Sequence, residues 1–446
     1  MAIGPDAGAT HQGRGAGRKL RWFAAILAGV VLLFALAAHL LLEPQRASRF
    51  LLDRIGASLG LEVRADGRAE YRLRGTPMLV LRDVSVREPG AARELLHADR
   101  ILLSVPWSTI RAAGDVLDAQ RLELDTPRVD LPALQHWLAS RPPSGTQRMP
   151  AFADGVRIRD GVLAGDDWRI DGIALELPRL AAGEALHARL RARYLAPPLQ
   201  APVDLAIAVV DPGALLRDAR TGFAASGRIG VRSDDGWALP GWLVLSGPLR
   251  IGAGGLRLQP ANVGIAAQWE SDGTRVPFAL GAHGPLRFDQ AVWLLADAGV
   301  VLRGRDAVAN DAANDLVPPL RARGQLALGR RLVLRLGGDI ARWPRAWPAL
   351  PKPLDAANAA MPFALDYTGT PDFGDAATLA LRRGDASLDA RVRLADLQAW
   401  LAAGDAQDPL PPLDARVRAP VLEFDGVRLE GVEATLSSPG ADDAAH

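Results

Sequence analysis

The sequence predicts a mainly β protein, in which an N-terminal transmembrane helix precedes a long, bent antiparallel β-sheet or groove with a few short helices. Three observations predict this fold. Residues 22–42 form an unbroken apolar stretch, apolar and polar residues alternate in many segments after residue 60, and Gly, Pro, Asn and Asp cluster at short intervals. Of the 446 residues, 49% are hydrophobic, so the chain beyond the apolar stretch can bury one long core or two ordinary ones.

The apolar stretch is predicted to be a membrane anchor. Residues 22–42 read WFAAILAGVVLLFALAAHLLL, with His39 as the one ionisable side chain. A helix rises about 1.5 Å per residue, so the segment covers roughly 30 Å, the thickness of a bilayer's hydrocarbon core. Basic residues dominate the preceding tail, which by the positive-inside rule places residues 1–21 in the cytoplasm and the body across the membrane. The alternative is a cleaved signal peptide, with Ala35-Leu36-Ala37 as the cleavage motif; the body leaves the cytoplasm in both cases.

Composition excludes several classes of protein. The chain has no cysteine, and therefore no disulfide, no cysteine-ligated zinc and no thiol nucleophile. Its 52 basic and 51 acidic residues give a net charge of +1, so no overall field attracts nucleic acid. We expect no nucleic-acid partner, and a body held together by burial and sheet pairing.

Strict alternation of apolar and polar residues predicts the strands. Residues 186–194 read LHARLRARY, and the same period of two recurs at 388–394 and 413–418. Asp-Gly pairs, typical of hairpin turns, follow or separate such runs. They occur at 160–161, 171–172, 272–273 and 425–426. The pattern predicts an antiparallel meander with one apolar and one wet face.

A few helices and linkers divide the body. Short helices are predicted at 106–113, 131–140 and 394–403, and an amphipathic helix at 43–59, where the chain leaves the membrane. The Pro-rich stretches 141–150 and 348–361 are the expected linkers. The predicted units are an N-terminal one at 43–140, a central β region at 151–345, a C-terminal β unit at 360–436 and a frayed tail at 437–446. Whether 196–345 continues the same sheet is left open.

No motif indicates catalysis. The seven histidines show no metal-ligand spacing, and the chain contains no H-E-x-x-H, G-x-S-x-G or phosphate-loop sequence. We therefore expect no enzyme activity, no metal and no cofactor. The 11 tryptophans are interpreted either as core anchors or as the rim of an apolar groove.

Several segments, taken in order, resemble the AsmA family of bacterial envelope proteins. The first is LGLEVRADG at 59–67, followed by PMLVLRDVSV at 77–86, with Asp83-Val84, and HADRILLSVP at 97–106. Three more are LELDTPRVDL at 122–131, VRIRDG at 156–161 and LDYTG at 365–369, and the last is LPPL at 410–413. The resemblance covers roughly residues 20–195 and 360–435. It consists of strand and turn patterns and contains no catalytic signature.

This resemblance implies a fold and a role. The family is similar to bridge-like lipid-transfer proteins, which stack bent antiparallel strands into a gutter with an apolar inner face. It implies a single-pass protein of the bacterial inner membrane with a periplasmic body, which binds or conducts phospholipid acyl chains in outer-membrane assembly and envelope lipid homeostasis. An envelope protein partner would extend its reach. The alternative is a non-catalytic periplasmic scaffold that tethers an envelope or secretion complex to the inner membrane.

Alternation assigns candidate residues to the lipid-facing side of the predicted sheet. They are Leu205, Ile207, Val209, Leu388 and Val392. This assignment depends on register, because a slip of one residue moves every side chain to the opposite face.

Overall fold

The computed structural model describes residues 60–437, except 73–74, 109–117, 141–148, 253–254, 272, 290, 306–315, 345–346, 348–349, 351–353, 355–359, 395, 397–399, 401–411 and 425–426. The predicted anchor at 22–42, with the segments around it, and most of the predicted helices at 106–113 and 394–403 lie outside these residues. Among the described residues, no helix is long and apolar enough to cross a bilayer.

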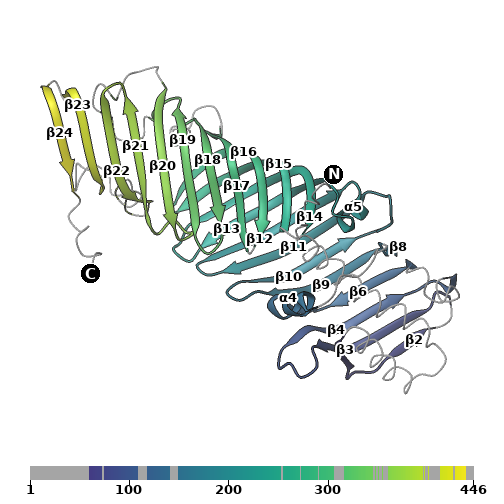
Figure 1. Cartoon of the computed structure of the whole chain (residues 1–446). Coiled ribbons are helices and arrows are strands. Elements are labelled where there is room, and N and C mark those ends of the chain that lie inside the picture. Colours follow the sequence, from purple (N-terminus) through teal and green to yellow (C-terminus); the bar gives the residue numbers. More distant parts are fainter. Residues whose placement is uncertain are drawn as a thin grey trace, which may run out of the picture.

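One sheet of 22 strands makes up most of the described chain, and Figure 1 shows its strands side by side from one end of an elongated molecule to the other. The N-terminal strands are β1 (Glu62–Ala65), β2 (Glu70–Arg72), β3 (Met78–Arg87), β4 (Glu94–Ser104), β6 (Arg121–Asp125), β7 (Arg128–Asp130), β9 (Val156–Ala164) and β10 (Arg169–Leu177). The central strands are β11 (Leu186–Ala196), β12 (Leu199–Val209), β13 (Thr221–Ser233), β14 (Ala238–Gly252), β15 (Gly255–Ser271), β16 (Thr274–Asp289), β17 (Val292–Gly304), β18 (Leu320–Leu328) and β19 (Leu332–Ile340). The C-terminal strands are β20 (Met361–Gly369), β21 (Ala376–Arg383), β22 (Ala386–Arg393), β23 (Asp414–Phe424) and β24 (Val427–Leu436).

The connectivity is that of a meander with one interruption. From β9 to β24 every strand pairs antiparallel with the next in sequence. At the N-terminal end β3 pairs with β1, β2 and β4, while β6 and β7 lie parallel to β9. A separate parallel pair joins β5 (Asp118–Ala119) to β8 (Ala151–Phe152). The described strands β12–β19 therefore continue the sheet, which answers the question that the sequence left open for residues 196–345.

Register gives the sheet two chemically distinct faces. Cross-strand partners in a sheet point to the same side. Starting from Leu190 on β11, one row of partners reaches Met361 on β20 and consists almost wholly of aliphatic residues: Leu205, Gly227, Leu243, Ile265, Leu280, Leu302, Leu320 and Ile340. The neighbouring row from Arg191 passes through Asp204 and Arg228. We call these two sides the apolar face and the charged face.

Three clusters of buried side chains lie on the apolar face. Short segments of the chain pack over the sheet at these clusters and help to bury them. Helix α4 (Leu131–Ala139) places Trp137 in the N-terminal cluster with Val84 and Ala98. Helix α5 (Pro212–Leu216) packs Leu215 into a second cluster over β14 and β15, and Trp343 packs into the third, over β16–β23.

Helix α4 confirms the predicted helix at 131–140. Asp130 caps it, because its Oδ1 accepts a hydrogen bond of 2.8 Å from the backbone N–H of Ala133, and a proline lies in the first turn. Two predicted hairpin turns are wrong. Asp160-Gly161 and Asp171-Gly172 lie inside β9 and β10, where Asp160 and Gly172 have positive φ and the register shifts, so both pairs form β-bulges.

The strands bend along a line of small residues. The register shifts where Ala261 meets Gly284 and again where Ala298 meets Gly324. Gly324 has a φ of +157°, and a Cβ there would overlap the carbonyl oxygen of Arg335 on the next strand. Glycine is therefore required for this close approach of two backbones.

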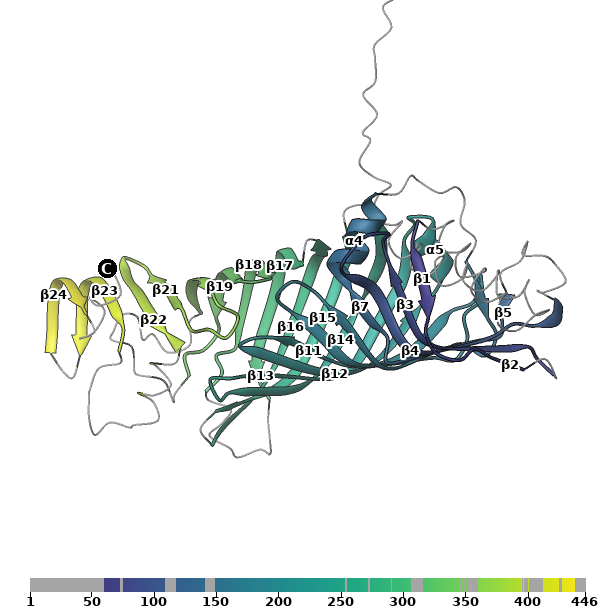
Figure 2. The same ribbon diagram turned by 90° about the horizontal axis from the view of Figure 1, so that it is seen from below.

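The sheet curls until two distant turns meet. Asp167, in the β9–β10 turn, forms an ion pair of 2.7 Å with Arg330, in the β18–β19 turn. In a flat sheet, the strands between them would separate these turns by on the order of 40 Å. Figure 2, seen from below, shows the strong bend of the strands. On β11 the charged-face residues are exposed and Leu186 and Leu190 are half-buried, which places the apolar face on the inside of the curl.

Candidate functional site: the apolar face of the sheet

The structure places all five sequence-predicted residues on one face. Leu205, Ile207 and Val209 lie on β12, and Leu388 and Val392 lie on β22. A single row of cross-strand partners connects Ile207 to Leu388, and its members are Ala225, Leu245, Val263, Ala282, Val300, Ala322, Gly338, Phe363 and Leu381. The two groups share this face but lie apart, because ten strand spacings correspond to roughly 48 Å.

Many side chains of the apolar face are half-buried, between full burial and full exposure to solvent. Leu205, Ile207, Leu388 and Val392 are half-buried, and Val209 is buried. Further large side chains of the apolar face remain half-buried along the central strands: Ile229, Val231, Leu243, Leu245, Ile265, Phe278, Leu280 and Leu302. An apolar row of this length that remains partly exposed offers surface for an apolar ligand.

Aromatic pairs lie near strand ends along the curl. Trp168 lies 5.9 Å from Tyr194, and Trp237 stacks on Trp269 at 4.6 Å between ring centroids. Trp237 is buried, whereas Tyr194 is 39% exposed. Burial of Trp237 fits the interpretation as a core anchor, whereas Trp242 and Trp293 are 48% and 38% exposed, so that interpretation does not hold for every tryptophan.

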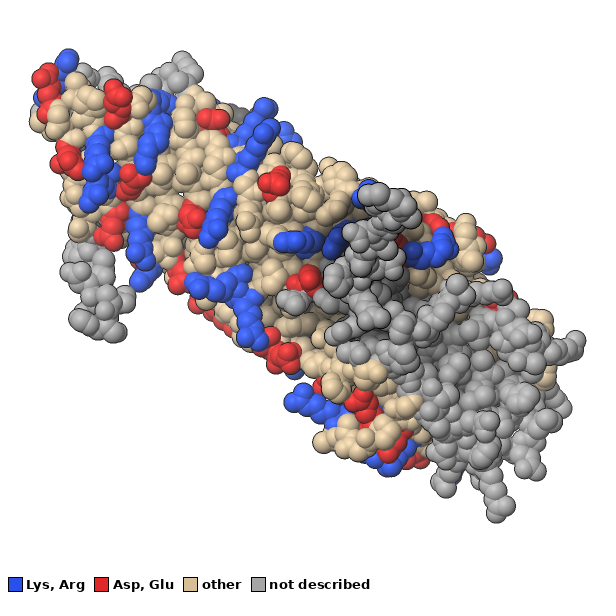
Figure 3. Space-filling model, in the orientation of Figure 1, with Lys and Arg blue, Asp and Glu red and all other residues tan. Residues whose placement is uncertain are grey.

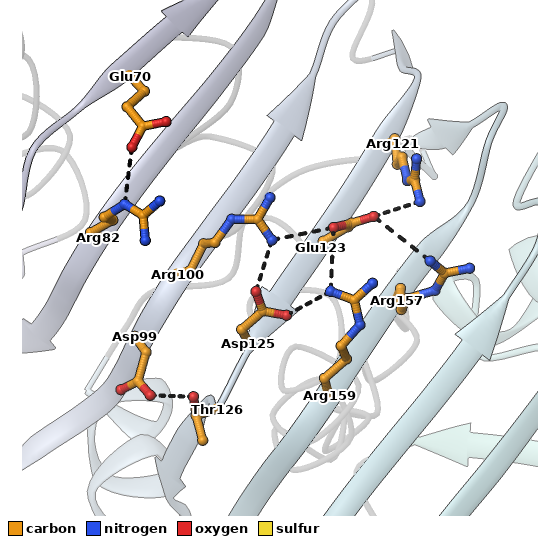
Figure 4. A network of polar contacts seen from close by, with 10 residues as sticks. All are labelled: Glu70, Arg82, Asp99, Arg100, Arg121, Glu123, Asp125, Thr126, Arg157 and Arg159. Atoms are coloured by element: carbon orange, nitrogen blue, oxygen red, sulfur yellow. Dashed lines mark hydrogen bonds and ion pairs between the residues drawn. The ribbon is translucent and has the colours of Figure 1, made fainter.

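The opposite face is held together by ion pairs between strands. Figure 4 shows the densest group, in which two carboxylates from β6 lie among four guanidinium groups from β4, β6 and β9. Glu123, only 7% exposed, pairs at 2.6 Å with Arg121 and at 3.4 Å with Arg100. The remaining contacts join Arg157 to Glu123, Arg159 to Glu123 and Asp125, and Arg100 to Asp125. Cross-strand pairs of this kind stabilise the sheet, so we assign the group a structural role.

The electrostatics of this group follow from its contacts. Partial burial opposes ionisation of Asp125, but hydrogen bonds from Arg100 and Arg159 outweigh it and hold the pKa of Asp125 below its usual value. The bond to Asp125 likewise raises the pKa of Arg100. These shifts keep Asp125 and Arg100 charged, which suits a stabilising network better than proton transfer.

A hollow of about 690 Å³ lies over β19–β24. Charged and apolar residues of the same strands line it together, among them Arg335, Asp366, Arg391, Leu365, Leu379 and Ala415. Figure 3 shows stripes of arginine and acidic side chains over this end of the molecule. The volume suits a small molecule or part of a larger amphiphile. No sequence pattern indicated this hollow, because six strands contribute to it.

The described residues contain no group of three or more His, Asp or Glu side chains that could hold a metal ion. Comparison of the chain with protein-family models, with curated proteins and with solved structures finds no match in any of the three.

Proposed function

We propose that this chain binds the acyl chains of lipids on the apolar face of its curled sheet, and that it conducts them along that face. The observation that carries the proposal is the row from Leu190 to Leu320, whose large side chains remain half-buried across β11–β18. Acyl chains are long, flexible and uniformly apolar. A long, half-buried aliphatic row fits them better than it fits a compact ligand.

The energetics favour such a ligand. Burying a methylene group stabilises by about 0.8 kcal/mol, so ten methylenes contribute about 8 kcal/mol before the costs of ordering the ligand are subtracted. The polar headgroup stays in water at the strand ends, beside aromatic side chains such as Tyr194. Movement along the row needs no covalent step, because neighbouring positions offer nearly the same environment.

The setting of this activity is part of the same proposal. The apolar stretch at 22–42 anchors the protein in the bacterial inner membrane, with the body in the periplasm. The sheet then receives phospholipid for outer-membrane assembly and envelope lipid homeostasis, as the AsmA-family resemblance implies. The path β1–β3–β4–β6–β9 and onward to β24 spans on the order of 90 Å, so a partner in the envelope would extend it.

The experiment places a charge on either face. The full chain is purified in lipid nanodiscs formed with isotopically labelled phospholipid, and the unlabelled phospholipid carried over from the cells is measured by mass spectrometry. We expect Ile207→Asp to remove most of it. The matched control is Ala206→Asp, the adjacent residue on the charged face, which is exposed and should keep its lipid. Equal loading of two folded variants would contradict the proposal.

A second candidate function is a scaffold that binds an envelope or secretion complex and carries no lipid. The feature that favours it is an exposed furrow on the charged face, described below. A wild-type chain that is folded but free of cell-derived lipid would favour the scaffold.

A further inference from the structure

The charged face carries one recessed apolar area, formed by two consecutive rows of cross-strand partners. The first row runs Arg228, Trp242, Ala266, Ala279, Arg303, and the second runs Ser226, Val244, Gly264, Gly281, Val301, Arg321. Each row has large residues outside and small ones in the middle. Trp242, Val244 and Val301 are 48%, 47% and 44% exposed, which is unusual for such side chains on a wet face. We call this area the outer furrow.

Its floor is open. A Cβ at Gly281 would meet nothing within 4 Å, and one at Gly264 would only touch Val244. The walls stand on β14 and β17, three strand spacings or roughly 14 Å apart. An α-helix with its side chains is about 10–12 Å across, so the width admits one helix. The small floor consists of two residue pairs, Ala266–Ala279 and Gly264–Gly281, roughly 7 Å apart along the strands, which matches about one helical turn. The larger pairs Gln268–Pro277 and Asn262–His283 bound it at its two ends.

The rim of the outer furrow carries arginines that form no ion pair with the described residues. Arg228 and Arg321 are exposed beyond the walls, and Arg303 is exposed on β17 near Val301. Arg323 lies beside Arg321 on the same face. Within the described part of the chain none of these four forms an ion pair, although Asp339 lies opposite Arg321 in the register. Asp204, opposite Arg228, is already held by Arg189 and Arg191.

Some other arginines of the same face are neutralised across strands, as in Arg189–Asp204 at 2.9 Å on β11–β12 and Arg418–Glu433 at 3.0 Å on β23–β24. Unpaired cations around an apolar area complement an anionic partner.

We propose that the outer furrow binds an amphipathic helix of a partner protein, with a narrow apolar stripe on the floor and acidic residues facing the arginines. A second copy of this face would repel the same four arginines. A flat bilayer would touch the walls and leave the floor over Gly264 and Gly281 unfilled. This inference is independent of lipid binding on the opposite face.

The test selects displayed helical 14-residue peptides on the full chain in nanodiscs. We expect the enriched peptides to carry small apolar residues at i, i+3 and i+4 positions flanked by Glu or Asp. Gly281→Leu fills the floor from a position where a Cβ meets no atom within 4 Å, and it should weaken binding at least tenfold. The exposed charged-face change Ala206→Leu, outside the outer furrow, should leave binding unchanged.

A second variant keeps the test decisive if Gly281→Leu folds poorly. Arg303→Glu with Arg321→Glu should weaken the same peptide at least tenfold, and a peptide with Lys in place of Glu should not bind. No enrichment, enrichment without acidic residues, or equal binding to the folded variants would overturn the proposal. Tethering of phosphatidylglycerol vesicles that requires Trp242 but tolerates Gly281→Leu would assign the area to a membrane and also overturn it.

Discussion

Glu123 is the group on which the charged network of β4, β6 and β9 depends. Four guanidinium groups and two carboxylates give this network a net charge of +2, which Glu123→Gln raises to +3. Removing one partner of a buried ion pair costs about 3–5 kcal/mol, whereas exposed pairs contribute about 0–1 kcal/mol. Glu123 is 7% exposed but its arginine partners are 26–47% exposed, so we expect an intermediate loss of about 2–3 kcal/mol.

Urea unfolding of the full chain in nanodiscs, followed by circular dichroism, measures this loss. Hydrogen exchange of peptides that cover β6 and β9 locates it, and we expect exchange there to accelerate more than in β20–β22. The control is Glu184→Gln, which removes a fully exposed pair with Arg179 and should leave the unfolding midpoint unchanged. If both variants unfold at the same urea concentration, the burial argument for Glu123 is refuted.

Three further predictions concern acid stability, the bend and the rim. The lowered pKa of Asp125 gives stability that is present above the unfolded value of about 3.9 and is lost as pH falls through the folded value, so Asp125→Asn should flatten the decline in unfolding temperature below about pH 4. Gly324→Ala should destabilise by about 3 kcal/mol or more in urea unfolding, because its Cβ overlaps a backbone oxygen, whereas Gly281→Ala should be close to neutral. Arg330→Glu replaces attraction to Asp167 by repulsion, and spin labels on the two turns should report a longer, broader distance with little change in unfolding midpoint.

Strict alternation allowed much of the sheet to be predicted. The segment 186–194 becomes β11, and its apolar residues share a face with Leu205, Ile207 and Val209 as parity required. The faces could be assigned here because no bulge interrupts the β11–β12 register.

Bulges explain where the prediction failed. Leu81 and Val84 on β3 are both buried in the N-terminal cluster, although their spacing is odd, because Asp83 between them has a φ of +50° and reverses the alternation. The Asp-Gly pairs inside β9 and β10 were misassigned as hairpin turns for the same reason. A local pattern does not distinguish a turn from a bulge when the outcome depends on which strand lies alongside.

The outer furrow and the hollow over β19–β24 are formed by residues that lie still farther apart in the sequence. Trp242 looks like an ordinary strand residue until the register sets Ala266, Ala279 and Arg303 beside it. The curl is equally hidden, because Asp167 and Arg330 approach only after the intervening strands have bent. Sequence reasoning therefore identified the face that carries the proposed lipid site, but not the shape of the surface.

Site-specific photo-crosslinking tests the central claim most directly. A benzophenone amino acid replaces either Ile207 on the apolar face or the adjacent Ala206 on the charged face of the full chain, in cells grown with ³²P-phosphate. We expect irradiation to attach labelled phospholipid to the chain from position 207 and not from position 206. Equal labelling from both positions, or none from position 207 in a folded chain, would contradict lipid binding on the apolar face.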